Sequence, residues 1–340
     1  MRIMHRYLNS NSHLNVIGPV MKILDEYSHS YKYKEDLNCV IPSFKYNIEF
    51  YLYEDNSDFI VLKKKLNEYL EPQVIGTEYD KEDEKNAEWF LIRTGEYQYP
   101  QPEKKFVYRE STFNLENYCK FCDIGKVQNN VYRLKSEPKQ KQLQFWGLHW
   151  EFGAVFVRDV AKKLIEREGV RGVRFTQPVL HKENVKIKDF YQLHIDTVLD
   201  KGFNSYNTDT ITCRYNNEEG LNKSKENNYC GRIKYHHPFI GGYCFDKNIF
   251  NSNFDIVETY EYFGGGGSAQ KLQIVSKRFK NLIEKKKLKG LIFIPVMHEE
   301  YNHVLNIKNN VVHAKKSRYS NFRIKKNISL IIKRLLKIVD

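Results

Sequence analysis

Cysteine is the residue type in this chain whose spacing best suits chemistry. Cys119 and Cys122 have two residues between them, a gap that lets both sulfurs converge on one metal ion. Cys213 and Cys230 have sixteen residues between them, so they meet only if the polar, asparagine-rich segment 202–228 loops out. Four thiolates hold Zn²⁺ tetrahedrally at about 2.3 Å. We therefore predict a zinc ion bound by Cys119, Cys122, Cys213 and Cys230.

Two alternatives to this ligand set stay open. His236 and His237 follow Cys230 closely and can supply nitrogen ligands in place of a sulfur. The cysteines can also be reduced thiols that hold no metal. A redox role is not favoured, because the first pair is predicted on a hairpin with Gly125 at its turn. Thioredoxin-like chemistry needs a cysteine of low pKa at the start of a helix.

The remaining polar side chains predict no catalytic site. The candidates that we set aside are Asp189 with His194 and Asp196, His149, and His298 with His303. The first group has no nucleophile nearby, His149 lies between two tryptophans as core histidines do, and the last pair lacks the H-E-x-x-H spacing. The glycine run 264–267 precedes a strand and has no Gly-Lys-Ser/Thr ending, so we interpret it as a connector. The sequence thus indicates a protein that is not an enzyme.

Two segments, 156–175 and 274–293, resemble each other at a constant offset of 118 residues. The identical pairs are Val157/Val275, Lys162/Lys280, Leu164/Leu282, Ile165/Ile283, Glu166/Glu284, Gly172/Gly290 and Phe175/Phe293. Each segment predicts a strand, a helix and a returning strand. In the first, Val160, Leu164 and Ile165 are expected on the apolar face of a helix over 159–168 that Gly169 ends. Gly172 predicts a bulge or a close approach of two backbones.

The N-terminal third predicts a further strand–helix–strand assembly. Tyr46–Tyr53 is rich in aromatic residues and alternates in part, as strands do. Phe59, Leu62, Leu66, Tyr69 and Leu70 then follow at helical spacing. An acidic segment, 77–88, predicts a short exposed helix that leads into a strand over 89–92, and the prolines at 100 and 102 indicate an extended connector.

These patterns predict an α+β fold of duplicated strand–helix–strand units, each preceded by a cysteine knuckle, with an additional N-terminal α/β domain. The expected parts are an N-terminal domain over 1–105, a double-cysteine-knuckle domain over 106–310 with repeats 118–180 and 210–297, and a basic tail over 311–340. The tail segment 315–340 carries a net charge of +8 out of +13 for the whole chain. This charge suits nucleic acid or an acidic protein, but the favoured explanation is a lysine-rich coding bias together with a solvated helix face.

Composition narrows the cellular setting. The 340 residues include six cysteines, too few for a disulfide scaffold, and no apolar run long enough to span a membrane. The first residues lack the features of a secretory signal. We therefore expect a cytoplasmic protein without membrane contact.

With these motifs assembled, the chain resembles the bacterial double-CxxCG motif family over roughly residues 118–297. The resemblance is carried by Cys119/Cys122, Gly172–Phe175, Cys230-Gly231-Arg232, 275–278 and Gly290–Phe293. The chain departs from the pattern where Asp123 replaces a glycine after Cys122, and where Cys213 and Cys230 are split. Some members look like immunity proteins. The resemblance implies a cytoplasmic antidote that binds one cognate toxin, so we expect a non-enzymatic immunity protein. The alternative is a zinc-knuckle protein that binds nucleic acid, in part through the basic tail.

Overall fold

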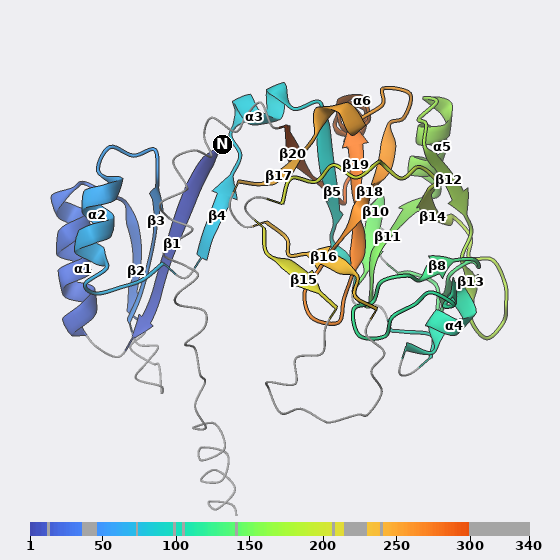
Figure 1. The fold of residues 1–340 in the computed structure, drawn as a ribbon, viewed down its shortest axis with the longest axis horizontal. Helices are drawn as coiled ribbons and strands as arrows, with labels where there is room; N and C mark the ends of the chain where they lie inside the picture. Colours follow the sequence, from blue (N-terminus) through green and yellow to red (C-terminus); the bar gives the residue numbers. More distant parts are fainter. Residues whose placement is uncertain are drawn as a thin grey trace, which may run out of the picture. The chain divides into compact units, whose positions relative to one another are not determined.

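The computed structural model describes residues 1–11, 14–35, 46–72, 74–97, 100–103, 106–139, 142–205, 208–213, 230–238 and 241–298. These residues form a mixed α+β fold, as the sequence predicts in outline (Figure 1). The chain divides into one unit of residues 1–297 and another of residues 298–340. The predicted basic tail, 311–340, lies outside the described residues.

The N-terminal strands form one antiparallel sheet in the order β2-β3-β1-β4. Its elements are β1 (Arg2–Asn11), α1 (Leu14–Glu26), β2 (Tyr31–Glu35), β3 (Tyr46–Tyr53), α2 (Phe59–Leu66) and β4 (Val74–Glu78). The β-α-β-β-α-β connectivity, with β1 and β3 as central strands, is the ferredoxin-like arrangement. The predicted strand Tyr46–Tyr53 is confirmed, whereas β1 and α1 add elements that we did not expect.

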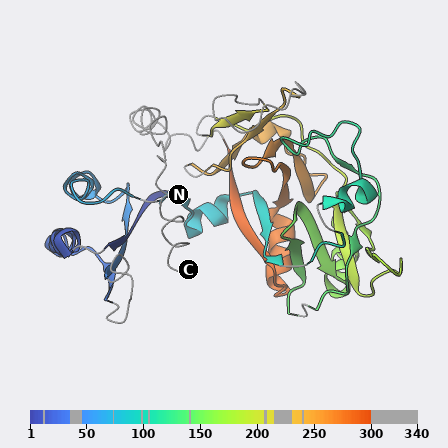
Figure 2. The same ribbon diagram turned by 90° about the horizontal axis from the view of Figure 1, so that it is seen from below.

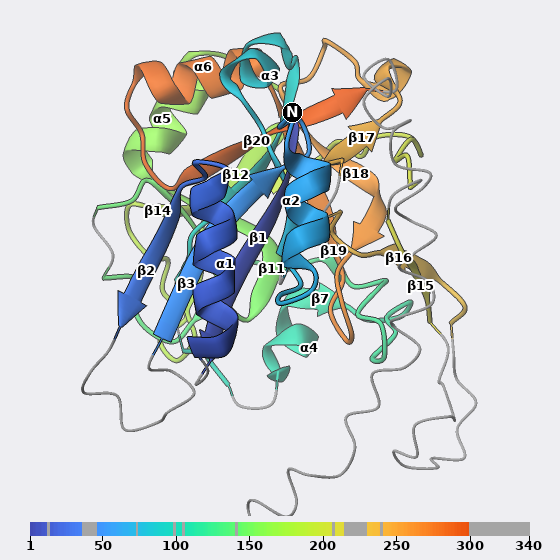
Figure 3. The same ribbon diagram turned by 90° about the vertical axis from the view of Figure 1, so that its left-hand side faces the viewer.

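Both helices of this part cover the same face of the sheet (Figures 2 and 3). Apolar residues at helical spacing on α1 and α2 pack against alternate residues of β1 and β3 because each periodicity places its apolar side chains on one face. The buried cluster contains Tyr7, Ile17, Val20, Leu24, Ile48, Phe50, Leu52, Phe59, Leu62 and Leu66. Tyr69, expected on the same helix face, follows the end of α2 and is 39% exposed.

The rest of the described chain builds two larger sheets. One has five strands in the order β12-β14-β11-β10-β6, and the other has seven in the order β15-β16-β18-β19-β5-β20-β17. The first contains β6 (Glu96–Tyr97), β10 (Phe145–Leu148), β11 (Glu151–Arg158), β12 (Val173–Thr176) and β14 (Phe190–Ile195). The second contains β5 (Trp89–Thr94), β15 (Thr210–Thr212), β16 (Ile233–Tyr235), β17 (Tyr243–Phe245), β18 (Ile256–Phe263), β19 (Gln270–Ser276) and β20 (Leu291–His298).

Short elements connect these sheets. They are α3 (Lys81–Asn86), α4 (Tyr108–Thr112), a 3-10 turn (Lys247–Ile249), and the paired strands β7 (Phe113–Asn114) with β8 (Val127–Gln128) and β9 (Arg133–Leu134) with β13 (Val179–Leu180). The predicted exposed helix after Thr77 is thus shorter than expected, since Thr77 and Glu78 belong to β4.

The two similar sequence segments fold alike. The first forms β11, α5 (Asp159–Arg167) and β12, and the second forms β19, α6 (Lys277–Lys285) and β20. In each, a third strand lies between the first and last. β14 pairs with β11 and β12, and β5 pairs with β19 and β20. The registers correspond as well, because Val157 lies opposite Tyr191 and Val275 lies opposite Phe90.

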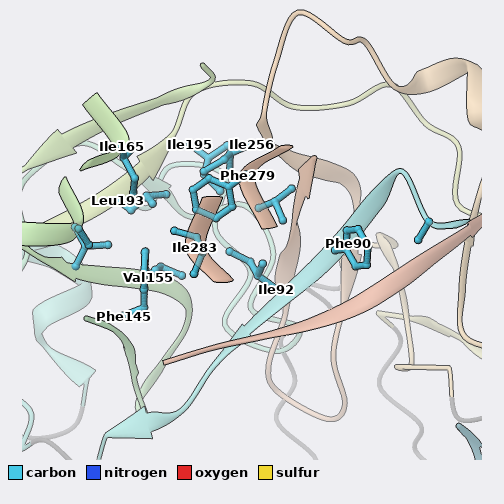
Figure 4. Packing of buried hydrophobic residues seen from close by; sticks show 14 residues of the cluster. Phe90, Ile92, Phe145, Val155, Ile165, Leu193, Ile195, Ile256, Phe279 and Ile283 are labelled. Carbon is cyan, nitrogen blue, oxygen red and sulfur yellow. The ribbon is translucent and has the colours of Figure 1, made fainter. Parts of the chain in front are cut away.

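The helices of both segments contribute to one hydrophobic core. Figure 4 shows Ile165 of α5 and Ile283 and Phe279 of α6 among side chains from both sheets. The prediction that Leu164 and Ile165 are buried is confirmed. The prediction for Val160 is wrong: its side chain is 58% exposed, and Ala161 takes the inward position one residue later.

Gly172 and Gly290 occupy matching positions before the last strand of each segment. Both have left-handed backbone angles, with φ of 96° and 111°. A Cβ atom on Gly172 would lie 2.2 Å from the carbonyl oxygen of Ile256, and one on Gly290 would lie 2.0 Å from that of Phe145. The predicted close backbone approach at Gly172 is therefore confirmed. It places the first segment against β18 of the seven-stranded sheet, and Gly290 places the second segment against β10 of the five-stranded sheet.

The strand over residues 89–92 was expected in the N-terminal domain. It forms β5, which lies between β19 and β20 of the seven-stranded sheet. The three-part division of the chain at residues 105 and 310 stays a prediction. β5 lies before residue 105 but pairs with β19 and β20, which lie after it.

Candidate metal centre

The first cysteine pair lies in a tight loop between β7 and β8, which confirms the predicted hairpin. The Cys119 amide donates to the Ile124 carbonyl at 2.9 Å, and the Asp123 amide donates to the Cys119 carbonyl at the same distance. Asp123 has φ of 64° and Gly125 has φ of 98°. Asp123 thus adopts the left-handed conformation that the expected glycine would favour. These bonds close the loop, and both sulfurs face the second cysteine pair.

The second pair is brought together by the antiparallel strands β15 and β16. Thr212 lies opposite Ile233, so Cys213 continues one strand just where Cys230 leads into the other. The Cys213 amide donates to the Arg232 carbonyl at 2.8 Å, and Gly231 has φ of 67°. The intervening residues 214–229 lie outside the described chain. The expectation that Cys213 and Cys230 meet despite their separation is confirmed.

The four sulfur atoms form one compact cluster, all within 4.8 Å of one another. The Cys119 and Cys213 sulfurs are 3.7 Å apart, and those of Cys122 and Cys230 are 3.6 Å apart. Sulfurs bound tetrahedrally to zinc at 2.3 Å are separated by about 3.8 Å. A disulfide instead needs about 2.05 Å. These separations fit four ligands around one metal ion.

The protein environment favours charge on the first sulfur of the loop. Burial opposes ionisation of Cys119, but the backbone amides of Cys122 and Phe121 outweigh it and lower the pKa of Cys119 to about 7. Burial raises the pKa values of Cys122 and Cys213. Those thiols must lose protons when a metal binds, so binding releases protons to solvent.

Two cations, Lys234 on β16 and Arg232 directly before it, bind the first cysteine loop. The Lys234 ammonium, 1% exposed, donates to the carbonyls of Cys122 at 3.3 Å and of Gly266 and Ser268 at 2.6 Å each. The Arg232 guanidinium donates to the carbonyl of Asn117 at 2.7 Å. Four thiolates around a divalent ion would leave an excess of negative charge, which the nearby Lys234 ammonium would offset in part. Burial lowers the pKa of Lys234, and the nearby sulfurs oppose that effect.

A buried network of charges fixes the far side of the cysteine loop. The Asp123 carboxylate pairs with Arg109 at 3.2 Å and with Lys126 at 3.1 Å. Lys126 also pairs with Glu151 at 2.6 Å, and the Tyr108 hydroxyl donates to Glu151 at 2.7 Å. Sequence reasoning missed this network because its members are spread over more than forty residues. Its only signal was the charged residue directly after Cys122.

The other sequence candidates lie apart from the sulfur cluster, which contains only cysteines among the described residues. His237 shares a hydrogen bond of 2.9 Å between its Nδ1 atom and the Tyr243 hydroxyl. His194 lies 3.7 Å from Asp196 on the exposed side of β14, where Arg174 also binds that carboxylate. Of the pair His298 and His303, the second lies outside the described chain.

The glycine run 264–267 is the turn of the β18–β19 hairpin. Gly264 and Gly266 have φ of 148° and 51°, which suits a sharp reversal of the chain. Since Gly266 and Ser268 accept bonds from Lys234, the turn contributes carbonyls to the surroundings of the metal centre. A phosphate-binding loop was not expected here, and the turn opens into a strand rather than a helix.

Comparisons with known proteins add no identification. No model of a protein family matches the chain, and no curated protein matches it. Among the helices that the structure describes, none has the length and apolar character needed to cross a membrane. The fold and the site thus define a mixed α+β protein with a closed, four-sulfur centre.

Proposed function

We propose that the four cysteines bind one zinc ion with a structural role. The support is the donor set: four sulfurs from two loops, three of them buried, at separations that suit tetrahedral Zn²⁺. Catalytic zinc sites keep one position open for water or substrate. Four protein ligands leave no such position, so a zinc ion here would crosslink the two loops and would not take part in a reaction.

Metal content tests this first proposal. The purified chain is expected to carry about one zinc ion, measured by elemental analysis. Cys122→Ser is expected to reduce the zinc content several-fold, because three sulfurs bind zinc less tightly than four. Cys244→Ser is the matched control, since Cys244 is also a buried cysteine but is not a member of the cluster. Equal zinc contents in the two variants would contradict the assignment.

We also propose that each strand–helix–strand unit, with its cysteine pair, descends from a duplicated ancestor. Matching strand registers support this, as do reciprocal contacts between the units. The Arg171 carbonyl accepts a bond of 3.2 Å from the Ile256 amide, and the Lys289 carbonyl accepts one of 3.1 Å from the Phe145 amide. Arg171 and Lys289 are themselves related by the offset of 118 residues.

We propose that the whole protein is a non-enzymatic, cytoplasmic binding protein, and specifically an immunity protein that neutralises a cognate toxin. The observation that carries the proposal is the closed sulfur centre, which fixes loops without offering a reactive position. The resemblance to the double-CxxCG motif family supports the specific role. Free cysteines suit a reducing compartment.

A candidate contact surface lies beside the first cysteine loop. Phe106 and Phe152 are 46% and 41% exposed, and they line a cavity of about 320 Å³ together with Arg109, Trp150 and His149. The Arg109 guanidinium lies 4.7 Å from the centre of the Phe106 ring. Aromatic and arginine side chains dominate the binding energy of protein interfaces. We propose that these side chains contact the toxin.

Co-purification with a toxin encoded beside the gene of this chain tests the immunity role. A complex and protection of cells that express the toxin are expected. Phe106→Ala with Phe152→Ala is expected to weaken the complex by about 2 kcal/mol or more, measured by calorimetry. Ile60→Ala, which truncates another exposed apolar side chain, is the control. The absence of both a complex and protection would refute the proposal.

A further inference from the structure

The N-terminal sheet presents a second face, away from α1 and α2, with a different character. Side chains alternate between the faces of a strand. Because Ile48, Phe50 and Leu52 of β3 are buried against the helices, Tyr51 and Tyr53 point the other way. We call this side the open face. Its aromatic and cationic side chains are Arg2, Arg6, Lys32, Lys34, Tyr51 and Tyr53.

The two tyrosines occupy the centre of the open face, on a central strand. Tyr51 lies opposite Arg6 of β1, and Tyr53 lies opposite Met4. Both residues are half-buried. The Arg2 guanidinium is 4.3 Å from the centre of the Tyr53 ring. The Tyr53 ring therefore already accepts a cationic group at its face, and aromatic side chains are also the groups on which bases of single strands stack.

Positive charge surrounds the tyrosines on the open face. Arg2 and Arg6 lie on β1, and Lys32 and Lys34 lie exposed on the edge strand β2. Two carboxylates share the face, and each is paired with an arginine: Glu78 with Arg2 at 3.1 Å and Glu49 with Arg6 at 2.7 Å. Four cations against two anions leave the face positive. The lysines line its edge, where a phosphate backbone could run past stacked bases.

We propose that the open face binds single-stranded nucleic acid, with Tyr51 and Tyr53 stacking on successive bases and Lys32 and Lys34 contacting the phosphates. Single strands are bound by aromatic side chains on a sheet together with a positive path for the backbone. A duplex does not expose its base faces and cannot use the tyrosines. This inference goes beyond the proposed toxin binding and does not depend on it or on the metal centre.

Fluorescence anisotropy of the full chain tests the proposal, with labelled 12-nucleotide RNA and DNA of one mixed sequence as probes. Tyr51→Ala with Tyr53→Ala is expected to weaken binding by about 30-fold or more, since each stacked base is worth at least about 1 kcal/mol. Tyr33→Ala is the matched control, because Tyr33 belongs to the same sheet but lies opposite the buried Ile48 on the helix-covered side. Comparison of RNA with DNA shows whether the sugar 2′-hydroxyl contributes.

Two further variants keep the test decisive if the alanine pair does not fold. Tyr51→Phe with Tyr53→Phe retains both rings and is expected to keep binding within about 3-fold. Lys32→Glu with Lys34→Glu is expected to weaken binding and flatten its salt dependence, whereas Lys64→Glu on α2 is not.

Three results would overturn the proposal. The first is no binding of either single-stranded probe by the unmodified chain at about 50 mM salt. The second is binding that the open-face variants leave unchanged, which would assign it to other basic residues. The third is a loss of toxin binding, without loss of nucleic-acid binding, in the tyrosine variants. That last result would make the open face a protein-binding surface.

Discussion

The paired glycines permit a sharp test of how the two sheets are joined. Gly172→Ala and Gly290→Ala each place a methyl group about 2 Å from a carbonyl oxygen of the neighbouring sheet, on a backbone with φ near 100°. The backbone conformation costs an L-residue about 1–2 kcal/mol. Ordinary carbon–oxygen contacts begin near 3.4 Å, so the carbonyl must also move by more than 1 Å. Such overpacking adds about 1–3 kcal/mol.

Gly169→Ala separates these two effects. Gly169 also has a left-handed backbone, with φ of 61°, but nothing lies within 4 Å of its added Cβ. It is expected to cost about 1–2 kcal/mol, against about 2–5 kcal/mol for Gly172→Ala or Gly290→Ala. Urea unfolding followed by tryptophan fluorescence measures the difference. Trp89, Trp146 and Trp150 are all buried in the part of the chain that contains the two larger sheets.

Similar losses in all three variants would refute this reasoning. Such a result would mean that the strands adjust to the methyl group at little cost, and that the reciprocal close approach does not hold the sheets in place. A loss in Gly172→Ala alone would show that the two junctions are not equivalent.

The remaining predictions concern protons and metal. Zinc affinity, measured by competition with a chelator, is expected to fall as pH falls, because the cysteine ligands bind zinc only as thiolates. Burial raises the pKa of Glu258 to about 7 from 4.5. The folded state therefore holds a proton that the unfolded state has released between these values, and the free energy of unfolding should fall by up to about 3 kcal/mol as pH rises through this window. Glu258→Gln should flatten that profile in urea titrations at pH 5 to 8. Burial lowers the pKa of His237 to about 4 from 6.5. His237→Gln should therefore reduce the loss of stability between pH 6.5 and pH 4, measured the same way.

Local patterns in the sequence predicted local structure well. The helix over Asp159–Arg167 follows from the spacing of Leu164 and Ile165, and Gly169 ends it as expected. Val160 was placed on the wrong face because a helix has about 3.6 residues per turn, so both position 160 and position 161 lie about one turn before Leu164 and Ile165. In the structure Ala161 is the buried one.

The candidate site was predictable in its ligands but not in its surroundings. Cysteine spacing identified the four sulfurs because metal ligands must converge whatever the fold around them. The role of Lys234 beside the cysteines could not be predicted from sequence, since one lysine among many basic residues carries no signal. Only the fold brings its ammonium within hydrogen-bond distance of three carbonyls. The charges around Asp123 likewise depend on contacts between distant segments.

Strand pairing over long distances was the largest omission. β1 and α1 carried usable signals, in the alternation of Ile3, His5 and Tyr7 and the helical spacing of Ile17, Val20 and Leu24. No sequence signal indicated which strands pair with β5. A strand over 89–94 reads the same whether it pairs with its neighbours in sequence or with strands from the other end of the chain.

The position of β5 has a consequence for synthesis of the chain. β5 leaves the ribosome early, yet both strands that flank it, β19 and β20, begin at residues 270 and 291. At about 5–20 residues per second, translation exposes both edges of β5 for roughly 10–35 s. Chaperone crosslinking to nascent chains stalled near residue 200 is expected to map to residues 89–94. The nascent chain therefore carries an unpaired apolar strand until its last third has been translated.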